Sequence, residues 1–220
     1  MIGVILLLTA LLVSGLLSNA ASVLTVSFIV SLLAYKFPNL YKKATYFYIV
    51  ALLISMTGIY FYLEPWVYIV NKGLIGFGFI YVVMMAGVLP NKWGISRAIK
   101  KNRGVFSILG FIFITPHASI RVLGLWGTVN IFGIAAYVIM IPLTIISFRV
   151  IRKQINPKDW FTIQKAAYGI YVLVFTHLLF MDFVLPENKI VYAVMTVLYI
   201  NNKLIKEYFK HENRRKVHIR

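Results

Sequence analysis

Long apolar runs without charge alternate with short basic connections along the whole chain. The first 35 residues contain no charged side chain, and such a run is too long for one untilted helix, which crosses a bilayer in about 20 residues. We therefore expect a hydrophobic hairpin of two short helices over 2–18 and 20–35, with a turn at Ser18 and Asn19. A cleaved signal peptide is not expected, because no Lys or Arg precedes this run.

Six further apolar runs follow, and each is about long enough to cross a hydrocarbon core of roughly 30 Å. The pattern predicts an all-α fold, a polytopic transmembrane helix bundle of six core spans plus the N-terminal hairpin, about eight spans in all. We expect three units: the hairpin (1–43), a six-helix transmembrane domain (44–204) and a basic cytoplasmic tail (205–220). The six runs cover 44–63, 67–89, 104–123, 125–148, 161–183 and a weaker 190–204.

The basic residues predict the orientation of these spans. The chain has 23 Lys and Arg against six Asp and Glu, a formal net charge of +17. All but three of the cations lie in or beside the connections 36–43, 90–103 and 149–160 and the tail from 203 onward. Because Lys and Arg are retained in the cytoplasm, these segments and both termini are expected to be cytoplasmic. The charge therefore indicates threading through a lipid bilayer, and no nucleic-acid partner is expected.

Composition narrows the chemistry further. The absence of Cys excludes disulfides, thiolate metal sites, iron–sulfur clusters and covalently attached haem. Any metal must be held by His, carboxylate or Met. No polar connection is much longer than a dozen residues, so a nucleotide-binding domain has nowhere to fold. The glycine-rich run 73–78 lies inside a predicted span, where close helix packing is its expected role. Richness in Ile, Lys, Asn and Tyr points to a low-GC bacterial genome, so the expected location of this multi-pass protein is the bacterial plasma membrane.

Two histidines, His117 and His177, lie inside predicted spans. Both spans run outward under this topology, and at 1.5 Å per residue both histidines lie roughly 10 Å below the outer interface. An ionisable side chain at that depth is costly unless it is paired or used. Two neutral imidazoles at one depth suit the axial positions of a haem iron held between facing helices. The simpler alternative is two separate histidines that form hydrogen bonds across helices.

Three neighbours bear on this pair. Arg121 lies one turn beyond His117 toward the outside, where it either neutralises a haem propionate or extends to the interface. Pro116 removes a backbone hydrogen bond and should bend the helix at His117. Zinc is a poor alternative, since it takes three or four protein ligands and only Asp182 is near enough to join the two histidines.

Two motifs lie between about 100 and 186. The first is the basic cluster Lys100-Lys101-Asn-Arg103 before a Gly-containing apolar span that reaches His117. The second is a helix that begins near Trp160 and carries Gln164 and, 13 residues later, His177. This arrangement resembles the ferric reductase-like transmembrane domain, the family of the haem-binding membrane subunit of bacterial methionine sulfoxide reductase (MsrQ), eukaryotic ferric reductases and NADPH oxidases. The resemblance implies a haem-binding membrane domain that transfers electrons.

The chain departs from the family at its inner end. Gln164 stands where the family commonly has an inner His, and Arg103 stands 14 residues before His117, where the partner of that His is expected. An amide is a poor axial ligand for haem iron. We therefore predict one b-type haem near the outer face, with His117 and His177 as its axial ligands.

The resemblance also implies a source of electrons at the cytoplasmic side. The cluster of Lys100, Lys101, Arg103 and Lys165 could bind the phosphate of a flavin (FMN or FAD), although the positive-inside rule explains the same residues. Quinol from the bilayer is a second possible donor. Because the chain has no dehydrogenase domain, the resemblance implies a separate reductase or flavoprotein.

The expected function is a membrane b-type cytochrome that carries electrons from a cytoplasmic flavin, reductase or quinol to an extracytoplasmic acceptor. Axial ligation by two His leaves no open coordination position, which favours electron transfer over oxygen binding. The main alternative is a transporter or channel subunit without a redox centre, in which His117, His177, Asp182 and Arg121 form a relay. A purely structural or assembly subunit is a further alternative.

Overall fold

The computed structural model describes residues 19–61, 63, 68–125, 129–180 and 185–218, with side chains as far as Phe209. Every regular element in these ranges is a helix, and they contain no strand. The all-α prediction is confirmed for this part of the chain. The first arm of the predicted hairpin, 2–18, lies outside the described residues.

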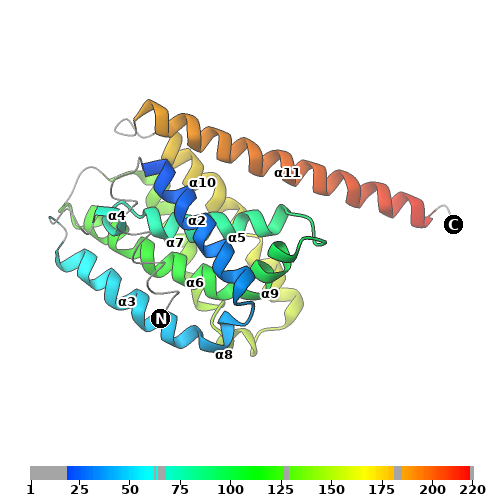
Figure 1. Cartoon of the computed structure of the whole chain (residues 1–220), viewed down its shortest axis with the longest axis horizontal. Coiled ribbons are helices and arrows are strands. Elements are labelled where there is room, and N and C mark those ends of the chain that lie inside the picture. The colour runs from blue at the N-terminus through cyan, green and yellow to red at the C-terminus, as the bar shows by residue number, and fades with distance from the viewer. Residues whose placement is uncertain (1–18, 62, 64–67, 126–128, 181–184, 219–220) are drawn as a thin grey trace.

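The helices form a bundle in which α11 runs along one side and extends well beyond the other elements (Figure 1). A short 3₁₀ helix, η1, links α2 and α3. The bounds are α2 (Asn19–Lys36), η1 (Leu40–Lys43), α3 (Ala44–Tyr60), α4 (Tyr68–Asn71), α5 (Leu74–Val88), α6 (Gly94–Val122), α7 (Ile131–Ile145), α8 (Arg149–Arg152), α9 (Pro157–Gln164), α10 (Ala167–Phe180) and α11 (Pro186–His218).

Four helical segments in the described residues are long and apolar enough to cross a membrane. They are Asn19–Lys36, Leu40–Tyr60, Gly94–Val122 and Pro157–Phe180. The apolar helices α5 and α7 have 15 residues each, which gives about 22 Å at 1.5 Å per residue. These helices fit a membrane-associated helical protein, although they do not reach the eight predicted spans.

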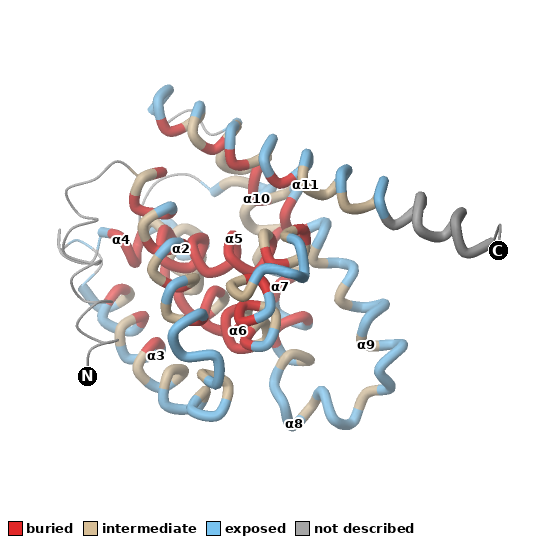
Figure 2. The backbone as a smooth tube through the Cα atoms, turned by 45° about the vertical axis from the view of Figure 1, so that its right-hand side comes forward, coloured by how far each residue is buried: buried red, intermediate tan, exposed pale blue. Residues whose placement is uncertain are grey.

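The outward face of α3 is apolar, as expected of a helix in lipid. Only Ala51, Ser55 and Gly58 of this helix are buried, whereas Leu53 and Met56 are 61% and 65% exposed. In Figure 2 the buried residues gather in the centre, on α5 and α6, and α8 and α9 lie at the exposed edge. An apolar exposed face of this kind is stable in hydrocarbon and unfavourable in water.

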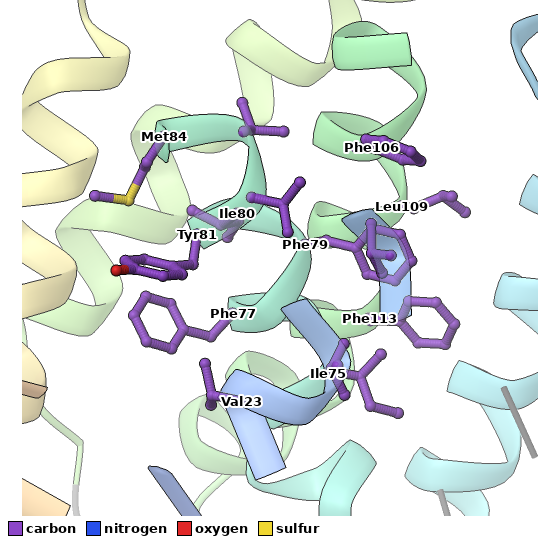
Figure 3. Close-up of a cluster of buried hydrophobic side chains, with 14 of the residues drawn as sticks. Val23, Ile75, Phe77, Phe79, Ile80, Tyr81, Met84, Phe106, Leu109 and Phe113 are labelled. Atoms are coloured by element: carbon purple, nitrogen blue, oxygen red, sulfur yellow. The ribbon is translucent and has the colours of Figure 1, made fainter. Parts of the chain in front are cut away.

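The core is built around α5, in which 13 of the 15 residues are buried. Phe79 on α5 stacks on Phe113 of α6 with ring centroids 5.8 Å apart, and Phe77 and Tyr81 point to the other side of α5 (Figure 3). Val23 of α2 packs into the same cluster.

Two glycines of the 73–78 run allow close helix packing. A Cβ on Gly76 would lie 2.7 Å from the Gly110 carbonyl oxygen of α6, and a Cβ on Gly78 would lie 2.6 Å from the Val26 side chain of α2. The prediction that this run serves helix packing is confirmed, because any larger residue at either position would force the helices apart.

Two predicted spans are interrupted in the structure. The run 67–89 contains α4 and α5, separated at Lys72 and by Gly73, whose φ of +69° is in the left-handed region. Glycine adopts that conformation without steric cost. In the run 161–183 a turn at Lys165 and Ala166 separates α9 from α10. The backbone hydrogen bonds there join residues three apart, so the turn tightens the segment Pro157–Phe180 without ending it. The sequence pattern does not reveal either break, because apolar residues continue on both sides of it.

Pro116 lies inside α6 and has a specific structural consequence. Proline has no N–H, so the carbonyl of Ile112, four residues earlier, lacks its helical donor. The Ser55 hydroxyl of α3 donates a hydrogen bond to that oxygen at 3.0 Å. The proline therefore gives α3 a buried attachment point on α6, five residues before His117.

Hydrogen bonds hold several basic segments together at one end of the bundle. The buried Asn102 of α6 accepts a hydrogen bond from the Tyr41 backbone N–H at 3.0 Å and donates one to the Pro38 carbonyl at 3.2 Å. Lys101 donates to the Asn39 side chain at 2.9 Å. Lys206 of α11 donates to the Gly87 carbonyl at the end of α5.

Candidate functional site

The two histidines of the apolar runs lie next to each other in the structure. The ring centroids of His117, on α6, and His177, on α10, are 6.2 Å apart, and the ring planes are inclined at 66°. Both side chains are half-buried. Helices α6 and α10 both begin toward the basic end, so the two rings meet at the opposite end of the bundle.

The break before α5 places a backbone acceptor against His117. In a continuous helix the Asn71 carbonyl oxygen would accept a hydrogen bond from the backbone four residues later. Here α4 ends at Asn71, and its carbonyl oxygen lies 2.9 Å from Nδ1 of His117. A carbonyl can only accept, so Nδ1 carries the proton and Nε2 keeps its lone pair. Metal-binding histidines are commonly oriented by such a bond.

His177 has a buried nitrogen without a hydrogen-bond partner. Its Nδ1 is buried and has no partner among the described residues. The ring packs against Gly133 of α7, where an added Cβ would lie 3.1 Å from Nδ1. Buried polar atoms in native structures are nearly always satisfied, so this nitrogen fits a site that receives a group from outside the chain.

Two cations flank the pair. Arg121 on α6 is near enough to act electrostatically on both histidines, and Lys72, at the break between α4 and α5, acts on His117. The structure therefore brings Arg121 to His117 and His177, the residues with which the sequence grouped it. Lys72 is an additional cation, one of the three that the sequence places away from the basic connections.

The donor set of two imidazoles would suit a metal ion that takes two nitrogen ligands from the protein. Metal–nitrogen bonds are about 2 Å long, so the centroid separation of 6.2 Å is of the size that one ion shared by two imidazoles would require. No group of three or more His, Cys, Asp or Glu that could hold a metal occurs in the described residues. Asp182, the third ligand considered for zinc, lies outside them. The residues present fit haem iron, which takes its other four ligands from the porphyrin.

The other predicted cofactor-binding residues lie at the basic end. Arg103 and Gln164 line one cavity of about 390 Å³, although they are 61 positions apart in the sequence. The Gln164 amide donates a hydrogen bond to the Ser147 hydroxyl at 3.2 Å. Lys165 is exposed in the turn between α9 and α10 and is not part of that lining.

Several residues that shape these sites were missed by sequence reasoning. The Asn71 carbonyl and Gly133 contact the two histidines, and Arg152 and Lys206 line the basic cavity. The only sequence signal for the first was the Lys72-Gly73 pair inside an apolar run. Arg152 and Lys206 looked like ordinary topology signals, because nothing in the sequence places them beside α6.

Comparison of the chain with protein-family models, with curated proteins and with solved structures finds no match. The resemblance to ferric reductase-like transmembrane domains therefore stays a prediction.

Proposed function

We propose that the chain is a membrane b-type cytochrome that carries single electrons toward the extracytoplasmic face through one haem held by His117 and His177. The single observation that carries this proposal is the 6.2 Å separation of the two rings at the end of the bundle away from the basic connections. A bound haem would supply a one-electron iron centre without an open coordination position.

The chain's own residues would prepare this site. The Asn71 carbonyl holds His117 in the tautomer that exposes Nε2, and Gly133 leaves space beside the His177 ring. Arg121 and Lys72 would offset the negative charge of the propionates, because opposite charges attract strongly where water is scarce. Phe113, four residues before His117 on α6, is buried and would help to exclude water from the site.

The proposal includes a full topology. Eight spans, with both termini in the cytoplasm of a bacterial cell, agree with the gathering of four basic segments at one end. Electrons would reach the haem from a separate cytoplasmic reductase or flavoprotein, or from quinol. Arg103 and Gln164, which face the basic cavity, are the residues of this chain best placed to meet such a donor.

Haem content of matched histidine variants tests the proposal. Wild-type protein, purified from haem-replete cells, should contain about one b-type haem per chain by the pyridine haemochrome assay. His117→Ala and His177→Ala should each lose it. The control is His211→Ala, in the basic tail, which should keep the wild-type haem content. Equal haem content in all four proteins would exclude the two histidines as ligands.

The alternative from another class is a transporter or channel subunit that uses His117, His177 and Arg121 as a relay. That function also explains polar residues at one depth. It predicts a colourless protein whose histidine variants lose transport. The haem content of the purified wild-type protein therefore distinguishes the two functions.

A further inference from the structure

A basic cavity lies at the end of the bundle opposite the histidine pair. Its volume is about 390 Å³, and it lies among the end of α5, the start of α6, the helices α9 and α10, and α11. Among the described residues that line it, none is Asp or Glu. Its five cationic lining residues are Lys100, Lys101, Arg103, Arg152 and Lys206.

These positive charges repel one another. Lys100 lies in the polar first turns of α6, before the apolar span that begins at Gly104. Burial, and then the positive charges of Lys206 and Arg103, lower the pKa of Lys100. An anion in the cavity would relieve this repulsion, because opposite charge at short range favours the protonated form of a lysine.

Neutral partners hold three of the cations in place. Lys206 and Lys100 donate hydrogen bonds to the carbonyls of Gly87 and Leu89, at the end of α5. The Arg152 guanidinium lies 4.2 Å from the centroid of the Trp160 ring. These partners fix the side chains without cancelling their charge, so the cavity keeps its positive potential.

The cavity also has an apolar side. Aromatic side chains of Trp160, Phe161, Tyr168 and Tyr171 line it. A smaller cavity of about 50 Å³ shares the residues Ser107, Ser147, Gln164 and Tyr171 with it. The rest of the lining of the smaller cavity is mainly apolar and includes Ile80, Leu143 and Ile170. The occupant therefore needs an anionic part for the cations and an apolar or aromatic part for the rest.

We propose that this cavity binds a phosphate-bearing amphiphile, with its phosphate among the five cations. Arg and Lys are the usual partners of phosphate oxygens. Two sources carry this chemistry: the headgroup of an anionic phospholipid, which basic pockets between membrane helices bind, or a soluble phosphate ester with an aromatic ring. The site is separate from the histidine pair and does not require that haem be bound there.

The experiment compares two double variants that have each lost two positive charges, together with a third variant that keeps its charge. Arg103→Gln/Arg152→Gln removes two cations from the cavity, and Lys42→Gln/Lys158→Gln removes two exposed cations from the same end of the molecule. Ser107→Leu places a larger side chain where the two cavities share their lining and keeps every charge. Each protein is reconstituted in phosphatidylcholine nanodiscs, and its thermal stability is measured after addition of phosphatidylglycerol in one arm and flavin mononucleotide in the other. Circular dichroism without ligand shows which variants are folded.

We expect one of the two ligands to raise the Tm of the wild type and of the Lys42/Lys158 control by several degrees. The shift should fall by at least half in the Arg103/Arg152 variant and in Ser107→Leu, and the arm in which it occurs identifies the source of the phosphate. No shift with either ligand would overturn the proposal. Equal shifts in all folded variants would also overturn it, because they would reflect general surface charge. Haem content does not enter this readout, so haem binding and phosphate binding can fail independently.

Discussion

Gly133 of α7 faces the His177 ring so closely that a Cβ at this position would lie 3.1 Å from Nδ1. Such a distance requires the ring to shift by a few tenths of an ångström. The glycine therefore sets the space in which His177 can turn, although it has no polar atom of its own at the site.

Substitution of Gly133 should weaken haem binding in proportion to the size of the new side chain. Overpacking a tight site costs about 1–3 kcal/mol, and 1.4 kcal/mol is a factor of about ten in affinity. We expect a modest loss of haem in Gly133→Ala and a larger one in Gly133→Val, measured by haem titration of the apoprotein. The control is Gly169→Ala in α10, where a Cβ meets nothing within 4 Å. Unchanged affinity in Gly133→Val would show that His177 does not hold the haem.

Ser55→Ala should destabilise the bundle. The change leaves the Ile112 carbonyl, already deprived of its donor by Pro116, without the hydrogen bond that Ser55 makes. A buried polar group left unpaired costs about 1–3 kcal/mol, and we expect a lower Tm in detergent. Thr57→Ala, on the exposed side of the same helix, removes a hydroxyl that bonds within its own turn and should change the Tm little. Equal Tm values for the two variants would contradict this role of Ser55.

Gln164→Ala should leave the haem content at about one per chain. The Gln164 amide bonds to Ser147 at the basic end, and an amide is a poor ligand for haem iron. The pyridine haemochrome assay on wild type and variant checks this. A wild-type value near two that falls in Gln164→Ala would show a second haem at the inner end.

The topology predicts where the C-terminus lies. Because the basic segments gather at one end of the bundle, they should all be cytoplasmic. A reporter that is active only in the cytoplasm should therefore be active when fused after Arg220, and a periplasmic reporter should be silent at the same position. The reverse pattern would invert the proposed direction of electron transfer.

The helical fold could be predicted from the sequence, but its interruptions could not. Apolar runs that long leave few alternatives to helices in a membrane, and their period says nothing about single backbone angles. The break at Gly73 depends on one left-handed residue, and it is this break that presents the Asn71 carbonyl to His117. The turn after Gln164 is hidden in the same way.

The two sites also differ in how far the sequence could predict them. Equal depth could be counted along two helices, and that count placed His117 and His177 level before any contact was known. The basic cavity could not be found by counting, because Arg152 of α8 and Lys206 of α11 lie 54 positions apart and only the packing of the helices brings both into its lining. Lys165, which follows Gln164 directly in the sequence, is exposed in the turn between α9 and α10 and does not line the cavity.

The most direct test of the haem proposal is the visible absorption spectrum of the purified wild-type protein, recorded oxidised and then after reduction with dithionite. Axial ligation by two imidazoles predicts the sharp reduced spectrum of a six-coordinate, low-spin b-type haem. A colourless, well-folded protein from haem-replete cells would contradict the proposal.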